Sequence, residues 1–191
     1  VAEALKVAQE DAMFYARSGG GMTISGGEPL LQSEFALNLL RLARERRVKT
    51  CIETCGLVPT DVVREAAQYL NYVLFDIKHM HKKHTGMPND LILKNFQTLV
   101  TEFPDLPITA RTPVIPGFND HGPDIKAICD FLKPFGHVKY EMLPYHRLGT
   151  QKYTFLDRVP PMGDVTLDDK KFAALQKIAV ATLGDRVIIP R

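Results

Sequence analysis

The sequence has few cysteines, no long apolar run and almost no excess of charge. Only three of its 191 residues are cysteine, which is too few for a disulfide scaffold, and their odd number favours a reducing compartment. No apolar run approaches the roughly 20 residues that span a bilayer, and the first residues lack the basic and apolar regions of a signal peptide. We therefore expect a cytoplasmic protein that does not enter a membrane.

The charge balance excludes a further class of partner. The chain has 24 Lys and Arg residues against 22 Asp and Glu residues, a formal net charge of +2. This balance leaves no excess of basic side chains to draw the chain onto nucleic acid or an anionic membrane. Hydrophobic residues make up 45% of the chain, which is enough for one domain with its own core, and no linker divides it. We predict a single domain over residues 1–191.

Predicted strands and helices alternate along the chain. The expected strands are 22–25, 48–54, 72–77, 108–114, 137–143 and 186–189, and the expected helices are 1–17, 34–43, 60–69, 90–103, 124–135 and 167–183. Alternation with short connections, together with right-handed crossovers, predicts a parallel α/β sheet or a barrel-like arc. Periodicity alone does not distinguish an open flat sheet from a curved one. Ser33 is the predicted N-cap of the second helix.

Polar side chains follow the predicted strands where each strand ends. The five segments are 25–29, 53–56, 76–79, 111–117 and 143–147, and each carries at least one charged or histidine side chain. Ligands of parallel α/β folds bind at the carboxyl ends of strands. Any one of these segments could be an ordinary solvated loop, but all five together predict a polar small-molecule site.

The segment Gly26-Gly27-Glu28-Pro29 is the most informative of these strand ends. The two glycines let the backbone approach a ligand closely, the Glu28 carboxylate offers an acceptor for an ammonium group, and Pro29 stiffens the exit of the loop. The glycine spacing of a dinucleotide-binding loop and the Gly-Lys-Ser/Thr of a phosphate-binding loop are both absent. The segment therefore predicts close backbone contact with a ligand other than a dinucleotide.

Several motifs, in one order along the chain, resemble the radical SAM enzymes, and specifically the glycyl radical enzyme activating enzymes such as pyruvate formate-lyase activating enzyme. The motifs are SGGGMTISGGEPLLQ at 18–32, IETCG at 52–56, FDIK at 75–78, TG at 85–86, Arg111 with VIPGFND at 114–120, and LPYHRLG at 143–149 followed by Lys152-Tyr153. They extend over nearly the whole chain. The resemblance implies a partial parallel (β/α) barrel of the radical SAM type, with its first strand missing.

The resemblance also implies which residues hold S-adenosylmethionine (SAM). The implied cofactor-binding residues are Gly26, Gly27, Glu28, Asp76, Ile77, Lys78, Arg111 and His146. The backbone at the two glycines would meet the ammonium group of SAM, Asp76 would add a carboxylate, and Lys78 would pair with the carboxylate of the cofactor. His146 would lie over the same end of the cofactor.

A candidate site for a monovalent cation follows from the same resemblance. Glu53, Thr54 and the Asp76 region occupy positions where relatives contribute oxygen ligands. Glu53 stands where the best-known relative has Asp, so whether an ion binds here stays open.

Radical SAM enzymes hold a 4Fe-4S cluster with three thiolates in a CxxxCxxC loop. Cys51 and Cys55 have the first spacing of that motif, but residue 58 is Val, so the third thiolate is missing. We interpret Cys51, Cys55 and Cys129 as packed thiols. The chain starts with Val1 rather than Met, and we expect the cluster ligands upstream of Val1. No catalytic residue is expected within residues 1–191, and we predict that the chain alone is inactive.

The resemblance implies a reaction and two partners for the full-length protein. An activating enzyme of an anaerobe would cleave SAM reductively to a 5'-deoxyadenosyl radical, which takes a hydrogen atom from a glycine of the partner, a glycyl radical enzyme. The electron would come from a donor such as flavodoxin or ferredoxin. Residues 118–120 and 148–158 are candidates for partner contact by position. His79, His81 and His84, which lie among lysines, are predicted to be solvated.

Two other functions remain open at this point. One is a radical SAM enzyme that acts on a small molecule. The other is an α/β ligand-binding domain without catalysis. The segment 143–149 with Lys152-Tyr153 favours the activating enzymes.

Overall fold

The computed structural model describes residues 1–80, 89–146, 153, 155–159, 162–163 and 165–189. Its strands are β1 (Met22–Ile24), β2 (Thr50–Thr54), β3 (Tyr72–Asp76), β4 (Ile108–Val114), β5 (Lys139–Pro144) and β6 (Val187–Ile188). Its α-helices are α1 (Ala2–Glu10), α2 (Ala12–Ser18), α3 (Ser33–Glu45), α4 (Thr60–Ala67), α5 (Asp90–Glu102), α6 (Gly122–Leu132) and α8 (Asp169–Leu183), with short 3-10 turns η1 (Pro29–Gln32) and η3 (Gly184–Arg186).

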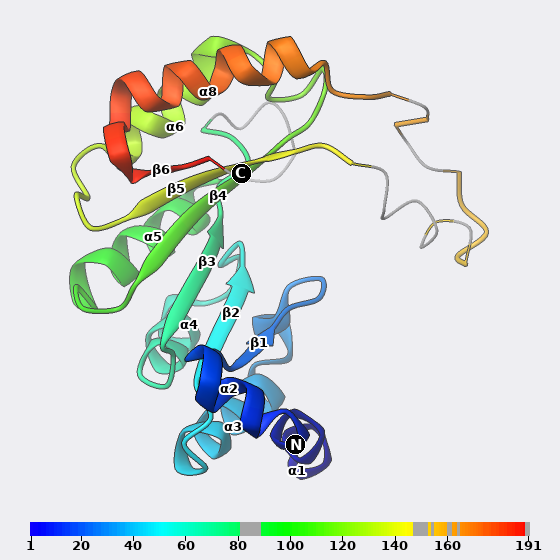
Figure 1. The fold of residues 1–191 in the computed structure, drawn as a ribbon, viewed down its shortest axis with the longest axis vertical. Helices are drawn as coiled ribbons and strands as arrows, with labels where there is room; N and C mark the ends of the chain where they lie inside the picture. The colour runs from blue at the N-terminus through cyan, green and yellow to red at the C-terminus, as the bar shows by residue number, and fades with distance from the viewer. Residues whose placement is uncertain (81–88, 147–152, 154, 160–161, 164, 190–191) are drawn as a thin grey trace.

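The six strands form one sheet in the order of the sequence, and every neighbouring pair is parallel. Right-handed crossovers that always step in the same direction place the connecting helices on one face of the sheet. In Figure 1 the sheet is an arc from β1 to β6, with α3, α4, α5, α6 and α8 along its outer side. The choice between a flat and a curved sheet is thereby decided: the fold is a curved, partial (β/α) barrel.

The hydrophobic core lies between the outer face of the sheet and the helices. Alternate strand residues such as Ile52, Phe75 and Tyr140 are at most 1% exposed, because successive side chains of a strand point to opposite faces. The rings of Phe75 and Phe96 meet edge to face with centroids 5.2 Å apart. The residues between these positions, such as Glu53, Asp76 and Arg111, point to the inner face of the sheet. Among the described residues, no helix is long and apolar enough to cross a membrane.

Two predicted local features differ in the structure. Residues 1–17 form two helices rather than one, because Asp11 leaves the helical conformation with φ −90° and ψ 10° and its N–H bonds to the carbonyl of Gln9. Aspartate competes with the helix for backbone hydrogen bonds. The predicted N-cap role of Ser33 is wrong: η1 runs directly into α3, so Ser33 is already helical. The cap in this segment is the carboxylate of Glu28, which accepts from the N–H of Leu30 at 3.2 Å.

Candidate functional site

The inner face of the sheet is polar, and its side chains come from alternate positions of the strands. Asp76 at the end of β3 pairs in register with Arg111 of β4, so both side chains point to the same face. The hydroxyl groups of Tyr72 and Thr109 are 2.6 Å apart on that face. Charged side chains of adjacent strands are therefore brought together inside the arc.

A single guanidinium group joins two carboxylates on this face. Nη2 of Arg111 hydrogen bonds to Oε1 of Glu53 and lies 3.2 Å from Oδ1 of Asp76. The hydroxyl of Ser25 donates to the second oxygen of Glu53 at 2.7 Å. Nζ of Lys78 lies 3.9 Å from the second oxygen of Asp76. These contacts link the ends of β1, β2, β3 and the middle of β4.

Burial and charge act in opposite directions on the ionisation of this cluster. Burial raises the pKa of Asp76 and outweighs the lowering by Arg111 and Lys78. Burial also raises the pKa of Glu53, but the hydrogen bonds from Ser25 and Arg111 lower it by more, so that the pKa of Glu53 lies below its ordinary value. Burial lowers the pKa of Arg111, but Glu53 and Asp76 raise it above its ordinary value. Arg111 is a permanent cation, and Glu53 is ionised at neutral pH.

A pocket of about 140 Å³ lies next to this cluster, at the carboxyl ends of β1, β2 and β3. Its lining residues are Gly26, Gly27, Glu53, Thr54, Cys55, Asp76 and Lys78. At Gly26 and Gly27 no heavy atom lies within 4 Å of where a Cβ would be, and Gly26 has φ +145°. The backbone of the two glycines is therefore open to a ligand.

Glu28 is not part of that lining, because its carboxylate is used within the protein. One oxygen accepts from the hydroxyl of Thr54 at 2.6 Å, and the other accepts from the N–H of Cys55 at 2.9 Å and from its thiol at 3.2 Å. These bonds fasten the loop after β1 to the end of β2. These contacts favour a structural role for Glu28 rather than the expected role as a direct acceptor for an ammonium group.

The sequence of this chain matches the Radical SAM superfamily over residues 2–132. The chain belongs to that superfamily. Among curated proteins it is 60% identical to the isethionate sulfite-lyase activating enzyme of Desulfovibrio desulfuricans, over the whole chain and 62% of that protein. It is 47% identical to the (2S)-3-sulfopropanediol sulfolyase activating enzyme of Bilophila wadsworthia, over 88% of the chain and 57% of that protein. The chain thus spans about three fifths of the length of these relatives.

Solved structures of other proteins share the same fold. A domain of the pyruvate-formate lyase-activating enzyme of Bacteroides vulgatus superposes with a TM-score of 0.70 at 27% identity, covering 90% of this chain and 99% of that one. SuiB of Streptococcus suis bound to S-adenosylmethionine gives a TM-score of 0.65 at 16% identity, over 94% of this chain and 39% of that one. The predicted radical SAM fold is confirmed.

The pocket residues fit the amino-acid end of SAM, the cofactor that the superfamily implies. Asp76 offers a carboxylate for an ammonium group, Lys78 offers an ammonium for a carboxylate, and Gly26 with Gly27 offers open backbone. The pocket is smaller than the roughly 300–1,000 Å³ of sites that enclose larger ligands. It therefore suits an amino-acid group rather than a nucleoside.

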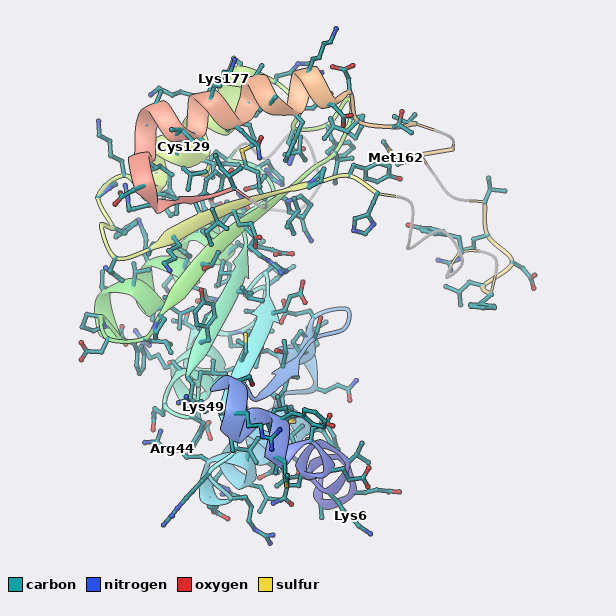
Figure 2. All side chains as sticks on the ribbon, in the orientation of Figure 1. Lys6, Arg44, Lys49, Cys129, Met162 and Lys177 are labelled. Atoms are coloured by element: carbon teal, nitrogen blue, oxygen red, sulfur yellow. The ribbon has the colours of Figure 1, made fainter. Side chains whose placement is uncertain are left out.

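The cysteines do not fit the 4Fe-4S cluster of radical SAM enzymes. Cys129 is fully buried in α6, and burial raises the pKa of its thiol to about 12; in Figure 2 it lies between the helix layer and the sheet. Cys51 and Cys55 are half-buried in β2 and the loop after it. Within the described part of the chain no three His, Cys, Asp or Glu residues form a group that could hold a metal ion. The interpretation of Cys129 as a core thiol is confirmed.

Three other predicted site residues lie outside the pocket. Ile77 is fully buried; its N–H donates to the carbonyl of Arg111 at 2.8 Å, and its carbonyl accepts from the hydroxyl of Thr112 at 2.7 Å. Arg111 lies on the inner face and contacts the pocket residues Glu53 and Asp76. His146 is exposed two residues beyond β5.

The expectation of a solvated His79 is wrong, and only part of one proposed partner loop is exposed. His79 is 4% exposed rather than solvated, and its carbonyl accepts from the side chain of Asn89; His81 and His84 lie outside the described residues. Within the proposed partner loop 118–120, Asn119 and Asp120 are 2% and 3% exposed. Only Phe118 of that loop is an exposed residue.

Asn119 has a structural role that the sequence analysis did not identify. Its side-chain amide donates to the carbonyls of Lys78 at 2.6 Å and Pro113 at 2.9 Å. Its oxygen accepts from the N–H of Ile115 at 2.7 Å. An asparagine among the apolar and turn residues of the VIPGFND motif could have indicated this role. A buried side-chain amide must satisfy its hydrogen bonds within the protein and can therefore hold neighbouring backbone in place.

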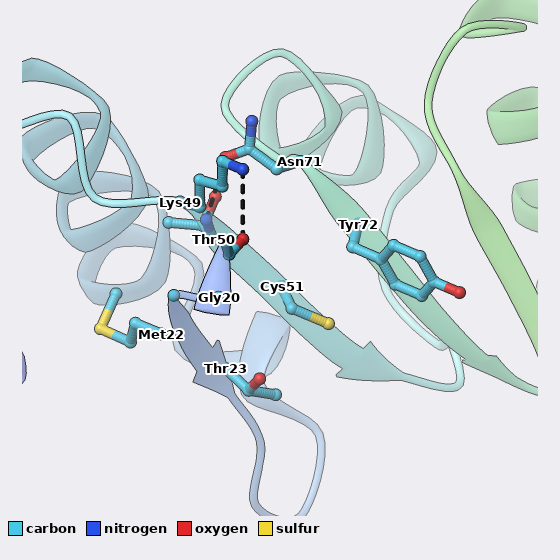
Figure 3. Close-up of a pocket in the computed structure, with 10 residues that line it drawn as sticks. Gly20, Met22, Thr23, Lys49, Thr50, Cys51, Asn71 and Tyr72 are labelled. Atoms are coloured by element: carbon cyan, nitrogen blue, oxygen red, sulfur yellow. Dashed lines mark hydrogen bonds between the residues drawn. The ribbon is translucent and has the colours of Figure 1, made fainter. Parts of the chain in front are cut away.

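A larger pocket lies at the opposite ends of the strands (Figure 3). It has a volume of about 580 Å³ and is lined by residues 19–23, 49–51, 71 and 72. Two of its polar side chains are already bonded within the protein: Lys49 donates to the carbonyl of Gly19 at 3.1 Å, and Asn71 accepts from the N–H of Thr50 at 3.0 Å. Because parallel barrels bind ligands at the carboxyl ends of strands, the smaller pocket is the candidate functional site.

Proposed function

We propose that the protein containing this chain activates a glycyl radical enzyme, and that this chain supplies the surface that holds SAM. The observation that carries the proposal is the pocket in which open glycine backbone, the Asp76 carboxylate and the Lys78 ammonium lie together. These groups complement an amino acid zwitterion. Identities of 60% and 47% to activating enzymes support the reaction class.

Each residue of the site has a separate task in this proposal. Gly26 and Gly27 accept the ammonium group on their backbone, Asp76 adds a carboxylate, and Lys78 pairs with the cofactor carboxylate. Glu28 holds the glycine loop against the end of β2 through Thr54 and Cys55. His146, exposed after β5, covers the same end of the cofactor. When bound and reduced by one electron, SAM supplies a 5'-deoxyadenosyl radical that takes a hydrogen atom from a glycine of the partner.

The proposed reaction also needs a 4Fe-4S cluster and an electron donor. The described residues contain no group for a 4Fe-4S cluster, whereas the curated relatives are longer than this chain. We propose that a further segment of the protein holds the cluster. A flavodoxin or a ferredoxin would reduce it.

The proposed partner is a glycyl radical enzyme that releases sulfite from a sulfonate. The relative at 60% identity is an isethionate sulfite-lyase activating enzyme, and the relative at 47% identity is a sulfolyase activating enzyme. Isethionate sulfite-lyase is the first partner to test.

Titration of the full-length protein with SAM tests the site. Lys78→Ala and Asp76→Asn should each weaken binding by about 10- to 150-fold, because each removes a hydrogen bond to a charged group worth about 1.5–3 kcal/mol. Lys126→Ala is the matched control, because among the described residues Lys126 forms only an exposed pair with Asp130 on α6. Unchanged affinity in both site variants would exclude this pocket.

Activation tests the reaction itself. The reconstituted full-length protein, with SAM and a reductant, should generate a glycyl radical signal in the partner by electron paramagnetic resonance, together with one 5'-deoxyadenosine per radical. Release of 5'-deoxyadenosine without a radical in any protein would favour a small-molecule substrate. Binding of SAM without cleavage would favour a non-catalytic domain.

A further inference from the structure

Two carboxylates of neighbouring strands share one guanidinium on the inner face of the sheet. Arg111 hydrogen bonds to Glu53 through Nη2, and its Nε and Nη2 lie 3.4 Å and 3.2 Å from Oδ1 of Asp76. The side chains of Arg111 and Asp76 are only 11% and 16% exposed, and that of Glu53 is 36% exposed. The cluster is thus partly removed from water.

Two acids in contact with one group repel each other. Their mutual repulsion grows as water is excluded, and it is relieved by a nearby positive charge or by protonation of one acid. Arg111 contacts both acids, whereas Lys78 lies 3.9 Å from Asp76. The sheet provides that charge through register: Asp76 pairs with Arg111, whereas Glu53 pairs with Leu74, two residues before Asp76. The guanidinium can therefore reach both strands at once.

The hydroxyl of Thr54 does not join the carboxylates of Glu53 and Asp76, although all three residues of the candidate cation site line the same pocket. Thr54 follows Glu53 in β2, so its side chain points to the opposite face of the sheet. Its hydroxyl donates to Glu28 at 2.6 Å and accepts from the N–H of Gly56 at 2.8 Å. Thr54 is 5% exposed. Its hydroxyl oxygen is therefore committed away from Glu53 and Asp76.

We propose that Arg111 is the built-in cation of this acid pair and that it positions Asp76 for the ammonium group of SAM without an added Na⁺ or K⁺. Arg111 is not among the residues that line the pocket. It acts through Asp76 and Glu53 and is a positioning residue. The inference rests on the proposed function for the ligand, but the charge arrangement stands independently of it.

Thermal unfolding of the full-length protein without SAM tests the charge arrangement. Wild type should unfold at the same temperature in NaCl, KCl and choline chloride at one ionic strength. Arg111→Ala should unfold about 5 °C lower in choline chloride and recover in part with 10 mM guanidinium, NaCl or KCl. At 10 mM, guanidinium is far below the molar concentrations that denature proteins. Arg111→Lys should unfold at a temperature between those of wild type and Arg111→Ala.

Titration with SAM in the same salts tests the positioning role. Arg111→Ala should bind SAM at least 10-fold more weakly than wild type and recover part of that loss with 10 mM guanidinium. A wild-type affinity that rises several-fold from choline to Na⁺ or K⁺ would overturn the inference, because an external ion would then occupy the site. Equal SAM affinity of Arg111→Ala and wild type would also overturn the positioning role while leaving the proposed function intact. If wild type does not bind SAM, the proposed function fails, and the unfolding data still test the acid pair.

A double variant covers the case in which Arg111→Ala does not fold. Removing one acid together with the cation relieves the repulsion, so Glu53→Gln with Arg111→Ala should be more stable than Arg111→Ala alone. A double variant that is no more stable would mean that Arg111 does not balance these carboxylates.

Discussion

Buried asparagines hold the loops that carry the site. Asn95 of α5 is fully buried and donates to the carbonyls of Gly56 at 2.7 Å and Val58 at 2.8 Å, in the loop after β2. Asn119 does the same for the backbone of Lys78, after β3. Neither side chain lines the pocket. Both fix the backbone from which pocket residues project.

Replacing Asn119 should therefore affect stability and binding together. Asn119→Ala removes three hydrogen bonds and leaves the carbonyls of Lys78 and Pro113 with one donor fewer. We expect the free energy of unfolding to fall by about 1–3 kcal/mol, measured by urea denaturation. The affinity for SAM should fall as well, because Lys78 loses its support.

Asn38→Ala is the matched control for Asn119. Asn38 lies on α3, and within the described part of the chain its side chain accepts a hydrogen bond only from Arg41 of the same helix, at 2.9 Å. Its removal should change stability by less than about 0.5 kcal/mol. Equal effects of the two substitutions would contradict the role assigned to Asn119.

At the scale of elements, the turn after β2 depends on one glycine. Gly56 has φ +67°, a left-handed conformation that favours glycine. A Cβ at this position would lie 2.7 Å from the ring of Phe75. The turn therefore joins the pocket segment Thr54–Cys55 to the core of the sheet.

Gly56→Ala should destabilise the protein by about 1–3 kcal/mol, through backbone strain and a clash with the core. Gly136→Ala is the control, because Gly136 has no heavy atom within 4 Å of where its Cβ would be. That control should be neutral or slightly stabilising. Urea denaturation measures both, and equal stability of the two variants would show that the turn tolerates a side chain.

The strands and helices could be predicted from the sequence because they depend on local patterns. Runs such as 72–77 are apolar except for one residue, Asp76, and β3 lies within that range. Strand order and curvature depend on pairing between distant segments, such as Asp76 with Arg111, and no local pattern encodes them. The opposite orientations of Glu53 and Thr54 were predictable from strand alternation. The burial of His79 was not, because it depends on packing against a later segment that includes Asn89.

At the scale of the whole molecule, one ion pair ties the loop before α6 to α8. Asp120 is 3% exposed and hydrogen bonds to Nζ of Lys171, and His121 lies 3.5 Å from its other oxygen. Burial raises the pKa of Asp120, but Lys171, the N–H of Gly117 and His121 lower it further, so the net pKa is below its ordinary value of 3.8. The pair joins segments that are 51 residues apart.

This lowered pKa gives a definite pH dependence. A carboxyl group whose pKa is lower in the folded state stabilises the protein fully above its unfolded pKa and loses that effect as the pH falls through its folded pKa. Asp120→Asn should therefore be less stable than wild type by about 1–2 kcal/mol at pH 7 and pH 5. The difference should shrink below pH 4, which urea denaturation at several pH values measures. A difference that does not depend on pH would contradict the ionic role.

Three exposed apolar residues between β5 and α8 are candidates for contact with the proposed partner protein. Phe155, Leu156 and Val159 are 83%, 64% and 87% exposed. Exposed apolar residues gathered on one surface often mark protein interaction sites.

Phe155→Ser should therefore slow activation of the glycyl radical enzyme by at least 10-fold and leave the affinity for SAM unchanged. Phe35→Ser is the control, because Phe35 is 44% exposed on α3, and α3 is a helix of the outer layer (Figure 1). The yield of glycyl radical at limiting partner concentration is the measurement. An equal loss in both variants would remove this stretch as the docking surface.

The two faces of the sheet carry different functions. The outer face forms the core that stabilises the fold, and the inner face carries the residues that determine which ligand the site binds. Outward residues such as Phe75 and Ile52 are fixed by the core, whereas inward neighbours such as Glu53 and Asp76 contribute little apolar packing. Substitutions on the inner face that keep acidic and basic side chains paired can therefore occur without changes in core packing. Along each strand, tolerance to mutation should alternate with a period of two, so that new specificities arise on one side of the sheet while the other stays constant.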